Sequence, residues 1–192
     1  EPGTPKGPTV TTTLSNTDLG TVKGATATPE IAVSIDMGKA ASLDELLENL
    51  RQDHQRKPAD KAISEKLSQV LLKKISTIRQ KSMEELEPLF KEAQEAAPDN
   101  FYVHYSWGSM YFSRENFEAV VLHMEPALAL QPDHLDANRK LGYSLMKMLK
   151  YDDALIPFER ALKQAPKDFY LLYFIGRCYS ELKEYDKAIE VW

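Results

Sequence analysis

A spacing of 34 residues in the second half of the chain constrains its fold more than any other feature. Gly108, Gly142 and Gly176 are separated by this step, and no other glycine follows Gly38. Six further series of prolines, alanines and large or small residues keep the step: Pro98, Pro132, Pro166; Ala93, Ala127, Ala161; Phe117, Tyr151, Tyr185; Tyr111, Leu145, Tyr179; Met124, Phe158, Trp192; and Val120, Ala154, Ala188. Such a period indicates a stack of equal supersecondary units.

Each unit contains two apolar-periodic stretches of helical length, for example at about 135–148 and 151–164. A glycine inside a helix costs about 1 kcal/mol relative to alanine, so a glycine in all three units indicates a close approach between helices. Small residues such as Ala154 and Ala188 are expected at the same contact. A proline after the second helix stops it and starts the next unit. The pattern predicts an all-α stack of helix-turn-helix units.

The units resemble the tetratricopeptide repeat (TPR) family, whose pattern is W-x2-L-G-x2-Y, then A-x3-F, alanine and proline. The matching segments are Trp107-Gly108-x2-Tyr111, Leu141-Gly142-x2-Leu145, Ile175-Gly176-x2-Tyr179, Ala154-x3-Phe158 and Ala188-x3-Trp192. The family's first tryptophan is replaced by His104, Asn138 and Leu172. The resemblance covers residues 101–192 and part of 83–100. It implies a right-handed superhelical stack whose first helices line a concave groove.

Composition divides the chain into three regions. Residues 1–41 hold nine of the ten threonines and no aromatic residue, so we expect a flexible Thr/Pro/Gly-rich tail or linker that builds no core. Within it, Ile31–Ile35 alternates like a strand and is interpreted either as linker or as a segment that docks into a groove of its own or a neighbouring molecule. Residues 42–100 are predicted to be a helical segment that includes a degenerate repeat. Residues 101–192 are predicted to form three repeats, at 101–134, 135–168 and 169–192, the last incomplete.

Two capping boxes and a proline organise the helical segment before the repeats. Ser42 with Glu45, and Ser82 with Glu85, have the spacing in which serine caps a helix and glutamate reaches back. Pro58 ends the first helix, and a second is expected from about residue 59 to 80. Counted back in steps of 34, the family's glycine and tyrosine fall on lysine and threonine, which indicates a divergent repeat or a cap.

The resemblance places an aromatic and basic set of residues on the concave face. Aromatic residues and arginine dominate binding hot spots, although packing between repeats is the alternative role for such residues. The predicted peptide-binding residues are Tyr102, Tyr105, Ser109, Phe112, Arg139, Lys140, Tyr143, Tyr170, Tyr173, Phe174 and Arg177, with Asp136 and Met146 on the same face. Tyr105 and Ser109 stand where some members have a lysine–asparagine clamp for a C-terminal carboxylate, so we expect no such clamp. The expected ligand is an extended or helical peptide with apolar anchors, and an acidic residue of it could meet Arg139, Lys140 or Arg177.

No catalytic, metal-binding or nucleic-acid-binding pattern emerges. The four histidines have no partner at helical spacing that would form a metal site, and Cys178 is typical of a small buried residue. The net charge is −5 without a basic stripe, which argues against nucleic acid. No apolar run reaches the roughly 20 residues of a membrane helix. We therefore expect no enzyme, no cofactor, no metal and no membrane insertion.

The sequence favours a non-enzymatic scaffold or adaptor that binds a peptide segment of a partner protein in the TPR groove during complex assembly. Two alternatives stay open: a secretion-type chaperone for a dedicated client, and the interaction domain of a larger enzyme. Self-association is compatible with all three. A start at Glu1 and a repeat that stops at Trp192 lead us to expect a processed start and a native continuation. The compartment stays open, with the cytoplasm slightly favoured, or the periplasm or secretion if a leader was removed.

Overall fold

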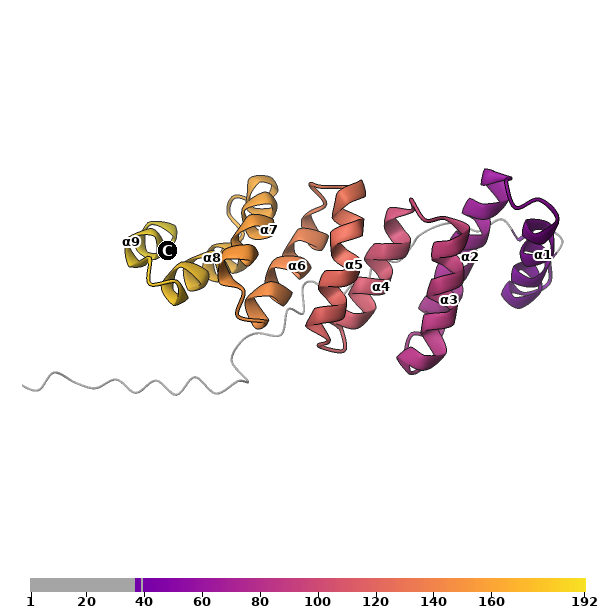
Figure 1. The fold of residues 1–192 in the computed structure, drawn as a ribbon, viewed down its shortest axis with the longest axis horizontal. Helices are drawn as coiled ribbons and strands as arrows, with labels where there is room; N and C mark the ends of the chain where they lie inside the picture. The colour runs from indigo at the N-terminus through magenta and orange to yellow at the C-terminus, as the bar shows by residue number, and fades with distance from the viewer. Residues whose placement is uncertain (1–36, 39) are drawn as a thin grey trace, which may run out of the picture.

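A computed structural model describes residues 37, 38 and 40–192, so the segment Ile31–Ile35 and nearly all of the predicted tail lie outside it. Within the described residues the secondary structure consists of α-helices joined by short turns and loops. Figure 1 shows the helices following one another in an elongated row from α1 to α9. The predicted all-α stack is confirmed. The helices are α1 (Leu43–Arg56), α2 (Lys61–Thr77), α3 (Met83–Ala96), α4 (Phe101–Phe112), α5 (Phe117–Leu130), α6 (Leu135–Lys147), α7 (Tyr151–Gln164), α8 (Phe169–Glu181) and α9 (Tyr185–Val191).

The first helix of every unit is capped in the same way, by a residue two positions after a proline. The side chain at the N-cap accepts a hydrogen bond from a backbone N–H of the first turn, as expected for a residue that satisfies the free donors of a helix end. The four caps are Asp60 for α2, Asn100 for α4, His134 for α6 and Asp168 for α8. The last three are 34 residues apart, whereas Asp60 precedes Asn100 by 40. The unit α2–α3 is therefore six residues longer than the others.

This insertion corrects the register that steps of 34 predicted for α2. Counted from its cap, the glycine position falls on Ser68, which is fully buried and accepts a hydrogen bond from Asn100 Nδ2 at 3.2 Å. Lys74, which steps of 34 placed there, instead pairs with Asp44 of α1, with Nζ and Oδ1 2.6 Å apart. A small buried residue is thus found at the glycine position of this longer unit.

The turn inside each 34-residue unit has one repeated geometry. Glu115, Leu149 and Lys183 have positive φ angles of 57°, 61° and 63°, the left-handed conformation that closes many helix C-termini. Next to Leu149, the backbone N–H of Lys150 donates to the carbonyl of Leu145 at 2.9 Å, and the other two turns make the equivalent bond. This Schellman geometry reverses the chain without glycine.

The structure tests the predicted close contact at the repeated glycine and the two predicted capping boxes. A β-carbon at Gly142 would lie 2.7 Å from the ring of Phe158, so the glycine does allow a close helix contact. The serine half of the first capping box is confirmed, because Ser42 Oγ accepts from the N–H of Glu45 at 3.1 Å. Its glutamate half differs, because the Glu45 carboxylate accepts from the N–H of Ala41, one residue before the cap, at 2.8 Å. The second capping box is wrong in its serine half, because the Ser82 side chain makes no capping hydrogen bond.

Polar residues replace the family's first tryptophan for a local reason. His104 Nε2 lies 3.0 Å from the carbonyl oxygen of Pro98, and Asn138 Nδ2 donates to the carbonyl of Pro132 at 2.8 Å. Both side chains are buried. Each one satisfies a carbonyl in the loop before its own helix, so it ties a first helix to the preceding unit.

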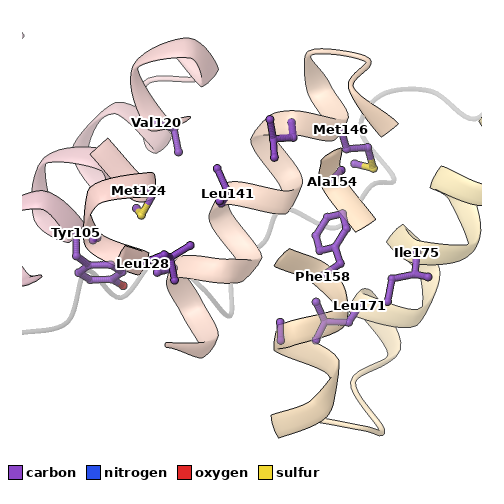
Figure 2. Close-up of a cluster of buried hydrophobic side chains, with 14 of the residues drawn as sticks. Tyr105, Val120, Met124, Leu128, Leu141, Met146, Ala154, Phe158, Leu171 and Ile175 are labelled. Atoms are coloured by element: carbon purple, nitrogen blue, oxygen red, sulfur yellow. The ribbon is translucent and has the colours of Figure 1, made fainter. Parts of the chain in front are cut away.

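The buried side chains form two clusters that meet at α4. The N-terminal cluster joins α1, α2, α3 and one side of α4, where Phe90 and Trp107 stack with their ring centroids 5.2 Å apart. The C-terminal cluster extends from α4 to α8. In Figure 2, Phe158 of this cluster lies beside Leu171 and Ile175 of α8. The core is thus a continuous seam along the stack, which leaves the other face of the first helices available for a site.

Candidate functional site: an aromatic hollow along the first helices

An open hollow lies where the first helices of three successive units meet. It is a shallow depression, and the empty space of about 370 Å³ above it includes open solvent. The residues that line it belong to α4, α6, α7 and α8. They are Phe112, Asp136, Arg139, Lys140, Tyr143, Phe158, Tyr170, Leu171 and Phe174. Most of this lining is aromatic or aliphatic. Its charged residues are the acid–base pair Asp136 and Lys140, and Arg139, whose partner Asp168 lies outside the lining.

The aromatic wall is centred on Tyr143 of α6. Its ring meets Phe112 of α4 edge to face at 5.5 Å between centroids and Phe174 of α8 at 5.4 Å. Phe174 in turn stacks on Phe158 at 5.6 Å. Such contacts are favourable beyond their buried area and hold the rings in fixed orientations. The wall is therefore ordered before any ligand arrives.

A buried polar network forms the floor of the hollow. The Tyr105 hydroxyl donates a hydrogen bond to Asp136, and the Lys140 ammonium donates to both Asp136 and the Tyr105 oxygen, the latter at 3.1 Å. Tyr105 and Lys140 are only 2% and 4% exposed. Burial raises the pKa of Tyr105, with Asp136 adding to the effect, and burial lowers the pKa of Lys140 against the opposing charge of Asp136. The ammonium is thus held by a carboxylate of the same helix.

A second acid–base pair joins α6 to α8. Arg139 Nη2 lies 3.2 Å from Asp168 Oδ2, while Asp168 Oδ1 accepts the backbone N–H groups of Tyr170 and Leu171 at 3.0 and 3.2 Å. One carboxylate therefore fixes the start of α8 and holds Arg139 against it. Both cations that line the hollow are paired with carboxylates of the chain.

Six of the eleven predicted groove residues line this hollow: Phe112, Arg139, Lys140, Tyr143, Tyr170 and Phe174. Tyr173 and Arg177 lie outside the lining and are half-buried, and Tyr102 is exposed on α4. Tyr105 and Ser109 are buried beneath the surface. Whether these residues bind a ligand stays a prediction.

Sequence reasoning missed Phe158, Leu171 and Asp168. Phe158 is fully buried in the core, and it also lines the hollow. Asp168 could have been found, because it recurs at the cap position two residues after Pro166. Its pairing with Arg139 depends on how two units dock, which spacing alone does not reveal.

The remaining chemistry of the described residues is sparse. Burial raises the pKa of Cys178 to about 11, which keeps its thiol protonated near neutral pH. No group of three or more histidine, cysteine, aspartate or glutamate side chains able to hold a metal ion occurs in residues 40–192. None of the helices in the described part is both long and apolar enough to span a bilayer.

Comparisons with known proteins agree with the repeat architecture. Residues 139–191 match the family model of the tetratricopeptide repeat. A stretch of 86 residues is 31% identical to Superkiller protein 3 of Schizosaccharomyces pombe, and it covers 45% of this chain but only 6% of that protein's length.

Solved structures share the fold of this chain. A structure of MamA superposes with a TM-score of 0.58 at 19% sequence identity, covering 82% of each chain. The structure of YrrB, described as a TPR protein with an unusual peptide-binding site, gives 0.56 at 19% identity over 78% of this chain and 74% of that one. At such identities the likeness concerns the fold alone. The repeat spacing, the family match over residues 139–191 and these superpositions agree on a fold built as a stack of tetratricopeptide repeats.

Proposed function

We propose that this chain is a non-enzymatic scaffold or adaptor that binds a segment of a partner protein in its concave groove. The observation that carries this proposal is the hollow, which is open to solvent and lined mainly by predicted groove residues. Proteins of this repeat family serve as interaction modules, and YrrB is described as having a peptide-binding site. We assign the same kind of role to the hollow of this chain.

The lining suits one large apolar side chain of a partner. Burying a leucine or phenylalanine side chain contributes about 1.5–3 kcal/mol. The rings of Phe112, Tyr143 and Phe174 already hold one another edge to face, so little ordering is lost when a ligand binds. The nearby charges of Arg139 and Lys140 are compensated by Asp168 and Asp136, so an apolar group covers no unpaired charge there.

Peptide binding to the full chain tests this function. The probes are fluorescein-labelled nine-residue peptides with amidated C-termini, built of glycine and serine around one central residue. Fluorescence anisotropy is expected to give affinities in the order Trp or Phe, then Leu, then Ala, with a difference of at least tenfold between the ends of the series.

A matched pair of variants places the binding in the hollow. Tyr170→Ala removes a lining residue that is 50% exposed, and Tyr185→Ala removes a tyrosine of similar exposure, 59%, outside the lining. We expect Tyr170→Ala to weaken the phenylalanine peptide about tenfold and Tyr185→Ala to leave it unchanged, with circular dichroism showing that both variants are folded. Equal affinities for the phenylalanine and alanine peptides, or equal effects of the two variants, would show that the hollow is not a peptide site.

A further inference from the structure

The cations near the hollow differ in whether they already have a partner. Arg139 and Lys140, in the lining, are each paired with a carboxylate. Lys147 and Arg177 have no carboxylate within 4.0 Å among the described residues. The Lys147 ammonium instead lies 5.3 Å from the centroid of the Tyr143 ring. Two unpaired positive charges therefore stand next to a hollow whose own charges are compensated.

Both unpaired cations lie at the same edge of the hollow. Lys147 is four residues after Tyr143 on α6, and Arg177 is three residues after Phe174 on α8, so each follows a lining ring by about one helical turn on the same face. A turn advances about 5.4 Å. Because the Tyr143 and Phe174 rings are in contact at 5.4 Å between centroids, the residues one turn after each of them lie on the same side of the hollow.

We propose that the hollow selects an extended segment in which an acidic residue stands two positions from the large apolar anchor, with its carboxylate held between Lys147 and Arg177. This inference rests on the proposed function and names the partner's chemistry. Residues two apart in an extended chain point to the same side and are separated by about 6.6 Å, close to one helical turn. The acidic residue therefore reaches the cations while the anchor fills the hollow.

The pairing of the floor charges explains why this edge is preferred. A carboxylate approaching Arg139 or Lys140 has to displace Asp168 or Asp136, and each of these already makes several hydrogen bonds. A carboxylate approaching Lys147 or Arg177 meets no carboxylate of the described residues that it would have to displace. The two contacts together are expected to strengthen binding roughly fivefold to twentyfold at low salt, and less at high salt.

A series of matched peptides tests the position of the acid. All carry one central phenylalanine in a glycine–serine background with amidated C-termini, and they differ in an aspartate or asparagine one, two or four positions before or after it. We expect aspartate two positions away, on one side, to bind about tenfold more tightly than its asparagine counterpart. At one position the side chain points away, so the aspartate and asparagine peptides should differ less than twofold.

Charge variants of the protein identify the partners of that aspartate. Lys147→Gln combined with Arg177→Gln should abolish the preference for aspartate and leave the asparagine peptide unaffected. Lys163→Gln, which removes an exposed lysine on α7 without an ion pair, is the control and should change neither. Arg177→Glu should reverse the preference, so that lysine at the same peptide position now binds better than aspartate.

The outcomes separate this inference from the proposed function. If phenylalanine peptides bind but aspartate and asparagine are equivalent at every position, the inference fails and the apolar site stands. The inference also fails if a free C-terminal carboxylate, tested with non-amidated peptides, gives the same gain regardless of aspartate. If no peptide of either series binds above the alanine probe, the proposed function itself fails.

Discussion

The second and third 34-residue units, α6–α7 and α8–α9, have the same architecture but differ in what covers their second helix. Phe158 in α7 is fully buried beside α8, whereas Trp192, at the same position of the third unit, is 66% exposed. Leu155 is partly buried and its counterpart Ile189 is 72% exposed. The two units follow nearly the same sequence rules. The comparison teaches that the burial of a side chain in this stack depends more on the unit packed next to it than on the sequence of the unit to which it belongs.

The largest expected effect comes from truncating the equivalent aromatic residues. Phe158→Ala removes a ring buried against Leu171 and Ile175 and should lower the free energy of unfolding by about 3–5 kcal/mol. Trp192→Ala removes a larger ring that is mostly in water and should lower it by about 1 kcal/mol or less. Urea unfolding followed by circular dichroism measures both values. Equal decreases in the free energy of unfolding would show that packing against a neighbouring unit does not distinguish Phe158 from Trp192.

The glycine position that recurs in each repeat gives a second matched pair. A β-carbon at Gly142 would lie 2.7 Å from the enclosed ring of Phe158, so Gly142→Ala should cost about 2 kcal/mol through overpacking. A β-carbon at Gly176 would lie even closer, 2.0 Å, to Trp192, but that exposed side chain can turn away into solvent. Gly176→Ala should therefore be near neutral, because the better helix propensity of alanine offsets the shift of the ring.

Thermal unfolding of the two alanine variants checks this difference. Their helical content at low temperature is the control for folding. A larger destabilisation by Gly176→Ala than by Gly142→Ala would mean that Trp192 is fixed despite its exposure, and would contradict the comparison.

Much of the stack could be predicted because its period appears directly in the sequence. The glycines at 34-residue spacing placed the first helices of three units, and the family resemblance named six of the residues that line the hollow. The same period failed for α2, because counting in equal steps passed over six extra residues. Pro58 and Asp60 carried the correct signal, since they repeat the proline and cap that precede each later unit.

What spacing could not reveal is contact between units. Tyr105 has the register of a groove residue, but Asp136 and Lys140 of the next unit cover its hydroxyl and bury it. The pairing of Arg139 with Asp168 likewise joins two helices whose relative position is set by packing. Such details depend on side-chain lengths and docking geometry, which a pattern of residue types does not encode.

In the first 34-residue unit, α4–α5, burial changes the pKa of His123 and so makes the stability of the chain depend on pH. The His123 ring stacks on Trp107 at 4.1 Å and on Tyr111 at 5.6 Å, and burial, with a smaller contribution from His104, lowers its pKa from 6.5 to about 4. Between these values the unfolded chain binds the proton and the folded chain does not, so stability falls as the pH drops from about 6.5 to 4. The loss should be about 1–2 kcal/mol, after allowance for the partial exposure of the ring.

The variant His123→Phe isolates this contribution, because it keeps an aromatic ring between Trp107 and Tyr111 but cannot titrate. Urea midpoints at pH 7 and pH 4.5 should differ less for His123→Phe than for the unchanged chain. An identical pH dependence in the two proteins would exclude His123 as its source and would leave other groups, such as His134, whose pKa burial also lowers.

The smallest expected change in stability comes from the turn between the two helices of each unit, where the second and third units should respond equally to the same substitution. Leu149 and Lys183 hold equivalent left-handed turn positions, with φ of 61° and 63°, and both are exposed. Glycine adopts this conformation without a steric cost, and this gain is partly offset because glycine loses more conformational freedom on folding. The net effect of Leu149→Gly and of Lys183→Gly should be a stabilisation of about 0.5 kcal/mol each. Because no neighbouring unit covers either turn, the two shifts in urea midpoint should agree. The backbone conformation at the two positions is the same. A clear difference between the two shifts in urea midpoint would therefore mean that the two units differ in something other than whether a neighbouring unit packs against them.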